Sequence, residues 1–280
     1  MTALFRRRAA GGFLSTPDSH ATLAELWQFR FLVGQLVRRD LTVRYRQTSL
    51  GWLWALVNPA LHLAMYWGVF GLMVRFSPPD VTAPYPLVLL CGLVLWMLFA
   101  TTVQAVSESL LNNLPLVKKV WFPRIALPLA ATGVGMVDFV LMLALLTGLC
   151  LLSGMPVALP ALPLLLLSGV LTALAGWGAG CLLAIARLRF RDVRHLVPLL
   201  LQALFYATPV VWTPGLLPPR WHAVLLNPLA PQVALFRHVL LGGALPSPVA
   251  LLTGLAGALL TAVVGYVCFV RYESRAMEHE

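Results

Sequence analysis

Long apolar runs without a single charged residue constrain this chain more than any other feature. Four of them cover residues 47–74, 81–107, 139–186 and 238–270. A helix needs about 20 apolar residues to cross a hydrocarbon core of roughly 30 Å. The third run would be about 72 Å long as one helix at roughly 1.5 Å per residue, so it must fold back on itself. Ser153, Gly154 and Pro156 mark the turn. The runs therefore predict a helical integral membrane protein.

The predicted fold is all-α, with six transmembrane helices in one domain that covers residues 1–280. The predicted spans are 51–75, 87–110, 128–152, 162–186, 196–213 and 248–270. Residues 1–20 are predicted to form a mobile basic tail. Between the fifth and sixth spans, Pro209 to Pro248 is rich in proline yet apolar. Proline breaks a spanning helix, so short re-entrant helices are predicted there, at the outer side.

The basic residues indicate how the chain is oriented. The net charge is +10, and all but three of the 20 Lys and Arg residues fall on the side that holds both termini. The exceptions are Arg75, Arg220 and Arg237. By the positive-inside rule, both termini are predicted to be cytoplasmic in a multi-pass protein of the cytoplasmic (inner) membrane. Attraction to anionic membrane lipid is a secondary role of this charge. No basic face alternates with aromatic residues on a soluble segment, so no nucleic-acid partner is expected.

Residues 21–46 are predicted to form an amphipathic helix before the first span. Its apolar stripe consists of Leu26, Phe29, Leu32, Val33, Leu36 and Val37. The prediction places it in the cytoplasmic interface of the membrane, and packing on another protein is the alternative. Candidate contacts to a lipid diphosphate headgroup are Arg38, Arg39, Arg44 and Arg46, because the planar guanidinium suits phosphate. Orientation charge alone would also account for these four arginines.

The connection at residues 112–124 is predicted to contain a short cytoplasmic coupling helix between Pro115 and Pro123, and it is a candidate docking site for a partner protein. It is longer than the roughly 2–8 residues that join neighbouring helices, and it mixes bulky apolar residues with cations. The residues assigned to ATPase coupling are Pro115, Val117, Lys118, Lys119, Val120, Trp121, Phe122 and Arg124. A loop packed on the membrane surface is the alternative.

This chain has no phosphate-binding loop of its own. Such a loop needs the pattern G-x-x-x-x-G-K-[ST]. The only two lysines, Lys118 and Lys119, follow Leu114-Pro115-Leu116-Val117, with no glycine among them. ATP and Mg²⁺ are therefore expected in a separate subunit. This chain is predicted to be a transport permease, not an enzyme, and to hold no cofactor.

Aromatic residues within the predicted spans are candidates for a substrate path. They are Tyr66, Trp67, Phe70, Trp96, Phe99, Phe205 and Tyr206. Stacked rings can guide a sugar by its C–H face without binding one sugar tightly. The alternative is that Trp and Tyr anchor span ends at the interface, while Phe packs.

Two carboxylates lie in or near the apolar spans. Asp138 lies deep in the third predicted span, and Glu108 lies at the cytoplasmic end of the second. An intramembrane carboxylate suggests function by default. A paired structural role, or a protonated Asp138 bonded across helices, is equally open.

The cysteines and histidines predict neither a metal site nor a catalytic centre. Cys91, Cys150, Cys181 and Cys268 lie within predicted spans and form no C-x-x-C pair. The six histidines show no ligand spacing. A membrane-embedded glycosyltransferase or acyltransferase remains an alternative class, although it would need converging acid–base or metal groups. A passive channel is a third alternative.

Four short motifs occur in a fixed order along the chain. They are RDLTVRY at 39–45 with LGWLW at 50–54, VKKVWFPR at 117–124, RFRDV at 189–193, and TPV at 208–210 with Asn227-Pro228. Together they resemble the ABC-2 type permeases of the polysaccharide and polyol-phosphate export branch, which handles O-antigen, capsule and teichoic acid. The resemblance extends from about residue 25 to 270.

The resemblance implies a half-transporter. A second copy of the chain and two separate ABC ATPase subunits would complete it. Its cargo would be a glycan attached to a polyprenyl diphosphate lipid. An ABC-2 exporter of a small lipid or a drug remains the alternative within the same class.

Overall fold

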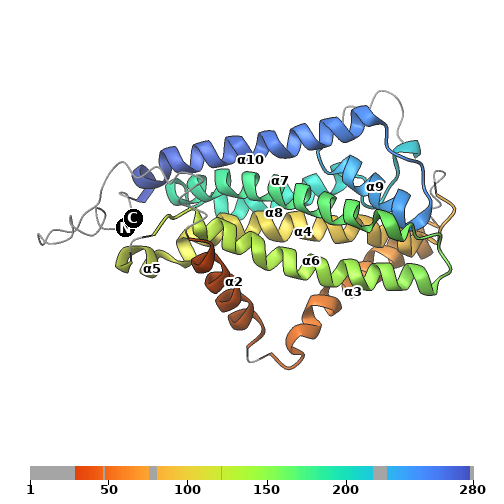
Figure 1. The fold of residues 1–280 in the computed structure, drawn as a ribbon, viewed down its shortest axis with the longest axis horizontal. Helices are drawn as coiled ribbons and strands as arrows, with labels where there is room; N and C mark the ends of the chain where they lie inside the picture. The colour runs from red at the N-terminus through yellow and green to blue at the C-terminus, as the bar shows by residue number, and fades with distance from the viewer. Residues whose placement is uncertain (1–28, 47, 76–80, 121, 217–225, 278–280) are drawn as a thin grey trace, which may run out of the picture.

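The computed structural model describes residues 29–46, 48–75, 81–120, 122–216 and 226–277, and this part of the chain contains helices but no strand. The predicted basic tail, residues 21–28 of the predicted interface helix, Trp121 and Arg220 lie outside it. Long helices run side by side along the long axis of the molecule (Figure 1). They are α4 (Tyr85–Asn112), α6 (Ala126–Leu152), α7 (Leu162–Arg189), α8 (Val193–Ala207) and α10 (Pro248–Met277).

Two further segments branch away from this bundle as a V (Figure 1). One arm is α2 (Arg30–Tyr45), which packs on α6. The other comprises η1 (Gly51–Leu53), α3 (Trp54–Tyr66) and η2 (Trp67–Met73), a π-helical turn. Gly51 begins this arm with φ +50°, a left-handed conformation that favours glycine.

Five helical stretches of the described chain are long and apolar enough to cross a membrane. They are Gly51–Met73, Tyr85–Asn112, Ala126–Leu152, Leu159–Arg189 and Pro248–Tyr272. Each corresponds to a predicted span to within a few residues. The multi-pass membrane architecture is therefore supported by the fold, while the total of six spans remains a prediction.

The predicted fifth span, 196–213, is wrong in its extent. Its helix, α8, has 15 residues and ends at Ala207, and the backbone of Thr208 is extended. Thr208 precedes Pro209, and the residue before a proline is driven out of the helical region. At about 1.5 Å per residue, α8 is roughly 22 Å long, shorter than a hydrocarbon core.

Prolines begin several of the helices. Pro86, Pro115, Pro163 and Pro231 each occupy the first or second position of a helix. A proline fits there because the N–H groups of the first turn have no partner within the helix. Pro115 thus begins α5 (Leu114–Lys119), the short helix predicted in the 112–124 connection.

Close helix packing depends on glycines of α7. A Cβ on Gly180 would lie 2.6 Å from the Val106 side chain of α4. A Cβ on Gly178 would lie 2.2 Å from the carbonyl oxygen of Thr261 in α10. Small residues let backbones approach in this way where lipid supplies no hydrophobic drive for association.

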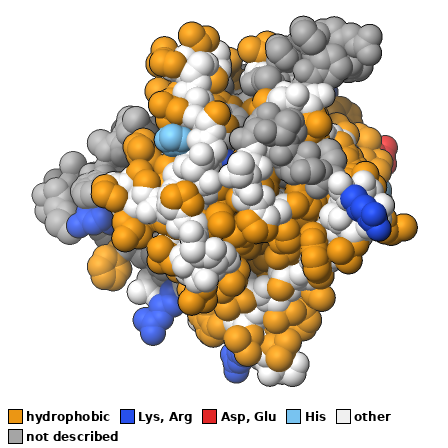
Figure 2. Space-filling view, turned by 90° about the vertical axis from the view of Figure 1, so that its right-hand side faces the viewer, with side chains coloured by type: hydrophobic (Ala, Val, Ile, Leu, Met, Phe, Trp, Pro, Cys, Tyr) orange, Lys and Arg blue, Asp and Glu red, His pale blue; other side chains and the backbone are white. Residues whose placement is uncertain are grey.

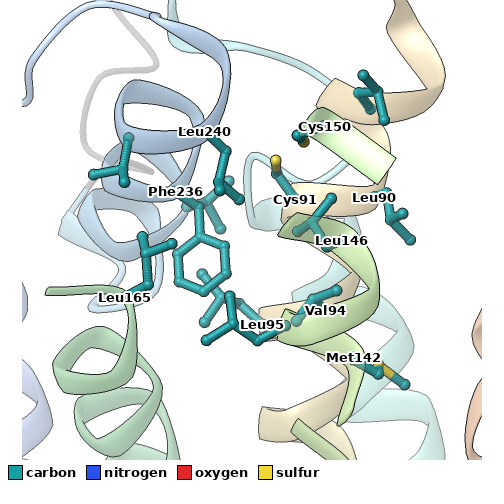
Figure 3. Packing of buried hydrophobic residues seen from close by; sticks show 14 of the residues in the cluster. Leu90, Cys91, Val94, Leu95, Met142, Leu146, Cys150, Leu165, Phe236 and Leu240 are labelled. Atoms are coloured by element: carbon teal, nitrogen blue, oxygen red, sulfur yellow. The ribbon is translucent and has the colours of Figure 1, made fainter. Parts of the chain in front are cut away.

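The remaining helix, α9 (Ala230–Leu241), closes one end of the bundle. Its Phe236 is fully buried and points among side chains of α4, α6 and α7, including Leu95, Leu146 and Leu165 (Figure 3). We call this end the α9 end, and the opposite end, where α5 lies, the α5 end. Seen from the α9 end, hydrophobic side chains cover most of the described surface, with cations at its margin (Figure 2).

Candidate functional site

The α5 helix presents a small exposed tip at one end of the bundle. Pro115, Lys118 and Lys119 are exposed, and Val120 is 53% exposed. An apolar side chain beside two cations is thus available to a partner. Of the other residues predicted for ATPase coupling, Val117 and Arg124 are half-buried, and Trp121 lies outside the described residues.

Phe122 is turned inward and is unavailable to a partner. It is 7% exposed and belongs to the buried cluster that joins Leu110, Ile125 and Leu188. Val117 packs against the same cluster. The chain's own core therefore accounts for part of the apolar character that predicted a covered segment.

The α2 helix is tied to the start of α5. The Arg39 guanidinium donates to Asn113 Oδ1 at 2.7 Å, and Asn113 Nδ2 donates to the Ser109 carbonyl of α4 at 2.9 Å. Arg39 also pairs with Asp40 at 2.7 Å. The described part of the predicted apolar stripe, including Val33, Leu36 and Val37, packs against the cluster around α6. A movement of α5 would therefore reach α2 directly.

The other end of α2 is tied to α6. Arg44 Nη1 lies 2.5 Å from Asp138 Oδ2, and the two residues are 94 positions apart. Of the alternatives that the sequence left open for Asp138, the structure shows a pairing, the ion pair with Arg44. All four predicted headgroup arginines are exposed, and Arg39 and Arg44 also form ion pairs.

Glu108 is also paired. Its Oε1 lies 2.9 Å from Nη1 of Arg187 and also accepts from the Gln104 side chain. The Arg187 side chain is buried, which the sequence did not predict, since it was interpreted as an orientation charge. The signal was its position directly after an uncharged run. The pair joins α4 to α7 near the α5 end.

Most of the predicted aromatic path gathers between α3, α4 and α8. Phe205 lies 4.9 Å from Tyr66 and 5.4 Å from Trp96, measured between ring centroids. Phe99 lies 5.7 Å from Trp96, and Phe70 packs against the same cluster. Trp96, Phe99 and Phe205 are buried within one copy of the chain, so they pack rather than line an open surface.

The rest of the aromatic set is accessible. Tyr206 is 54% exposed, and its ring contacts Phe205 at 5.3 Å. Trp67 is exposed and lies over Gly71, and Tyr66 is half-buried. Phe70 is half-buried as well, so the predicted path remains a prediction for these accessible rings.

The α9 end holds a second polar cluster around the strap Thr208–Thr213. Arg237 is buried and donates to the carbonyls of Val210 at 2.9 Å, Trp212 at 3.3 Å and Val88 at 3.4 Å. Asn227 Nδ2 donates to Thr208 Oγ1 at 2.8 Å, so the two halves of the fourth motif meet. The broken backbone predicted here is held by these bonds, as membrane-embedded irregular backbone requires.

Potential metal ligands do not converge in the described chain. No group of three or more His, Cys, Asp or Glu side chains that could hold a metal ion occurs among the residues searched. Cys91, Cys150 and Cys181 are buried free thiols.

Comparison with known proteins identifies the family. The model of the ABC-2 type transporter family matches residues 32–241. The chain belongs to the ABC-2 type transporter family. The matched region begins in α2 and ends at the last residue of α9, so it includes the three ion pairs described above, α5, the aromatic cluster and the strap.

Curated relatives are similar over most of their length. An O-antigen export system permease protein RfbA from Myxococcus xanthus is 32% identical over 216 residues, 75% of this chain and 79% of the relative. One from Klebsiella pneumoniae is 28% identical over 251 residues, 88% and 94% of the two chains. The polysialic acid transport protein KpsM from Escherichia coli is 25% identical over 226 residues, 78% and 84%.

Proposed function

We propose that this chain is the permease subunit of an ABC exporter that moves a lipid-linked polysaccharide across the cytoplasmic membrane. The observation that carries the proposal is its similarity, over at least 75% of its length, to permeases named for O-antigen and polysialic acid transport. The polysaccharide class follows from these relatives. The lipid link, cytoplasmic termini and two copies per transporter are finer proposals.

The energy for transport would come from ABC ATPase subunits at the α5 end. The exposed tip of α5, formed by Lys118, Lys119 and Val120, suits a groove on a soluble protein, because an apolar anchor within a polar rim is typical of such contacts. Cations of this end, such as Arg124 and Arg191, support its placement in the cytoplasm.

A charge reversal tests this docking site. We expect Lys118→Glu with Lys119→Glu to uncouple ATP hydrolysis from export. The two cations that would attract the ATPase subunit become anions that repel it. Reconstituted complexes would be compared by their ATPase rate and by glycan transport into vesicles. Arg191→Glu with Arg194→Glu is the matched control, because both arginines are exposed at the same end, one in the turn before α8 and one in its first turn. Normal coupling in the lysine variant would remove α5 as the docking site.

The glycan would pass the accessible rings of Tyr66, Trp67 and Tyr206 where two copies of the chain meet. The arm η1–α3–η2 and α8 leave many large apolar side chains exposed, among them Met65, Leu72, Leu199 and Leu200. Their adjacency is fixed by the contact of Tyr66 with Phe205. A second copy covering this face would place the rings of both copies around one path.

Affinity purification from native membranes tests the whole proposal. We expect a stoichiometric ATPase subunit to be recovered with the tagged chain, and mass spectrometry to find a glycan-bearing lipid. A retained drug-like molecule or simple phospholipid would instead favour the small-lipid or drug exporter. Transport by the isolated chain without any ATPase would overturn the proposal.

A further inference from the structure

A narrow cleft lies beneath the ion pair of Arg44 and Asp138. It is formed by α3, α4 and α6, and its polar lining includes Asn58 and Thr101. Its volume is about 30 Å³, room for about one or two water molecules. The cleft itself therefore has no room for a phosphate while Arg44 and Asp138 are paired.

An apolar groove lies on the neighbouring flank of the same arm. Leu50, Trp52, Leu53 and Leu56 line it from η1 and α3, and Leu141 and Leu145 line it from α6. Its volume is about 540 Å³, and the lining contains only apolar residues. Leu141 lies one helical turn beyond Asp138 on α6, so the groove begins beside the ion pair. An apolar chain that ends in a phosphate matches this succession of surfaces.

We propose that Asp138 is a displaceable counter-ion that sets the affinity threshold of the Arg44 site, so that diphosphate-bearing lipids bind there and singly charged lipids do not. It neutralises Arg44 while the site is empty, and an incoming headgroup must displace it. Displacement also breaks the ion pair between α2 and α6, while the packing of Val37 against Gly133 remains. The inference rests on the proposed function, in which the cargo is attached to a lipid diphosphate.

The selectivity follows from charge. Carboxylates and phosphates both accept hydrogen bonds from a guanidinium, so each can replace the other at Arg44. A phosphodiester headgroup carries one negative charge, the same as the carboxylate that it would displace, and gains little. A diphosphate carries more charge and gains more. Ordinary anionic phospholipids are thereby rejected.

The displaced carboxylate sets the threshold for this exchange. The Asp138 side chain is 14% exposed, whereas that of Arg44 is 43% exposed. Leaving a largely buried carboxylate without its cation costs free energy, and this cost is higher inside a membrane. Only a ligand that interacts with Arg44 more strongly than Asp138 does can meet that cost.

The same exchange would break one of the two side-chain contacts, Arg44–Asp138 and Arg39–Asn113, that link α2 to the bundle. Arg39 would still hold α2 to Asn113 at the start of α5. At the α6 contact, a Cβ on Gly133 would lie 2.7 Å from Val37, so the two helices touch closely there. Cargo binding at Arg44 and ATPase docking at α5 would then act on one helix.

Ligand binding to the full chain in phosphatidylcholine nanodiscs tests the proposal. The probes are farnesyl diphosphate and phosphatidylglycerol, and native mass spectrometry measures the bound fraction. We expect the native chain to bind farnesyl diphosphate and to retain little phosphatidylglycerol. Asp138→Asn should raise the affinity for both probes about tenfold, because the cost of displacing the carboxylate, about 1.4 kcal/mol for this factor, is the same for either ligand. Arg44→Gln should lose most diphosphate binding. Inorganic pyrophosphate, added separately, should bind the native protein less tightly than farnesyl diphosphate if the groove holds the apolar chain.

A double variant separates the ion pair from general electrostatics. Asp138→Asn should have no effect on either probe once Arg44 is Gln, because the competition no longer exists. Asp192→Asn, an exposed carboxylate outside the cleft, is the matched control and should change neither affinity. Unchanged affinity for both probes in Asp138→Asn, or an equal gain in the Arg44→Gln background, would overturn the inference.

A second measurement addresses structure directly. Spin labels at the exposed Val43 and Val140 report the distance between α2 and α6. Farnesyl diphosphate in the native chain, and Asp138→Asn without ligand, should both widen this distance, while Asp138→Glu keeps the pair and should not. A fixed distance in the first two cases contradicts the breaking of the ion pair between α2 and α6. If Arg44→Gln loses diphosphate binding but Asp138→Asn changes nothing, this inference fails and the proposed function survives.

Discussion

Two apolar spans of this chain differ in how much of each is buried by the rest of the protomer. In α4, 83% of the most apolar 18-residue window is buried inside the chain, against 6% of that window in the arm η1–α3–η2. Both lack charged residues over a membrane's thickness, although α4 is the more apolar of the two. Lipid tails are as apolar as Leu, so hydrophobicity alone does not decide which span is covered.

Small residues on the neighbours decide it. α4 is met by Gly176 and Gly180 of α7, where an added Cβ would lie 3.2 Å and 2.6 Å from atoms of α4. In the arm, a Cβ on Gly68 would meet nothing within 4 Å. The arm is also interrupted by Pro59 and by the π-helical η2. One span is therefore the fixed centre of the protomer, and the other is left for lipid or for a second copy.

The largest expected effect comes from filling the α4–α7 contact. We expect Gly180→Leu to destabilise the protomer by about 4 kcal/mol, because even its Cβ would overlap Val106. The unfolding midpoint in detergent, followed by size-exclusion chromatography, measures this. Gly68→Leu is the matched control in the arm, where the space is open. Equal loss in both variants would break the contrast between the spans.

A smaller effect is expected from removing side-chain volume. Leu95 of α4 is fully buried, whereas Leu61 of α3 is 58% exposed. We expect Leu95→Ala to cost about 2–3 kcal/mol through the cavity it leaves, and Leu61→Ala to cost under about 0.5 kcal/mol within one protomer. Thermal unfolding measures both. If Leu61→Ala instead lowers the dimer fraction in native mass spectrometry, a second copy covers the arm.

The smallest expected effect concerns the exposed rings beside the arm. We expect Tyr206→Ala to lower glycan export about threefold, the loss of one stacking contact of about 0.7 kcal/mol, while assembly remains intact. Vesicle export assays measure it. Tyr206→Phe, which keeps the ring, should be close to normal. Tyr272→Ala, an exposed tyrosine of α10 away from the cluster, should export normally, and normal export in Tyr206→Ala would remove this ring from the path.

The sequence predicts the spans well because crossing the lipid requires only a continuous apolar stretch of sufficient length, which can be read along the chain. The spans predicted at 87–110 and 128–152 correspond to the helices Tyr85–Asn112 and Ala126–Leu152. The end of α8 was misplaced because the apolar character continues beyond Thr208, although Pro209 was a local signal against the helix. The helix at α5 followed from local sequence in the same way, with Pro115 at its start.

The sequence could not predict which charged side chains pair across the bundle. Arg44 meets Asp138 over 94 positions and Arg187 meets Glu108 over 79, and no periodicity links such residues. The burial of Phe122, which a coupling segment did not suggest, depends on α6 and α7 meeting at one place. Which aromatic rings face inward was likewise set by the contact of α8 with α3 and α4.

Arg237 gives the α9 end a property of its own. Its guanidinium holds the strap through main-chain carbonyl oxygens of Val210 and Trp212. A guanidinium N–H can only donate and a main-chain carbonyl can only accept, so each group has one fixed role in this contact. The hydrogen bonds that hold the strap therefore do not depend on which side chains positions 210 and 212 carry.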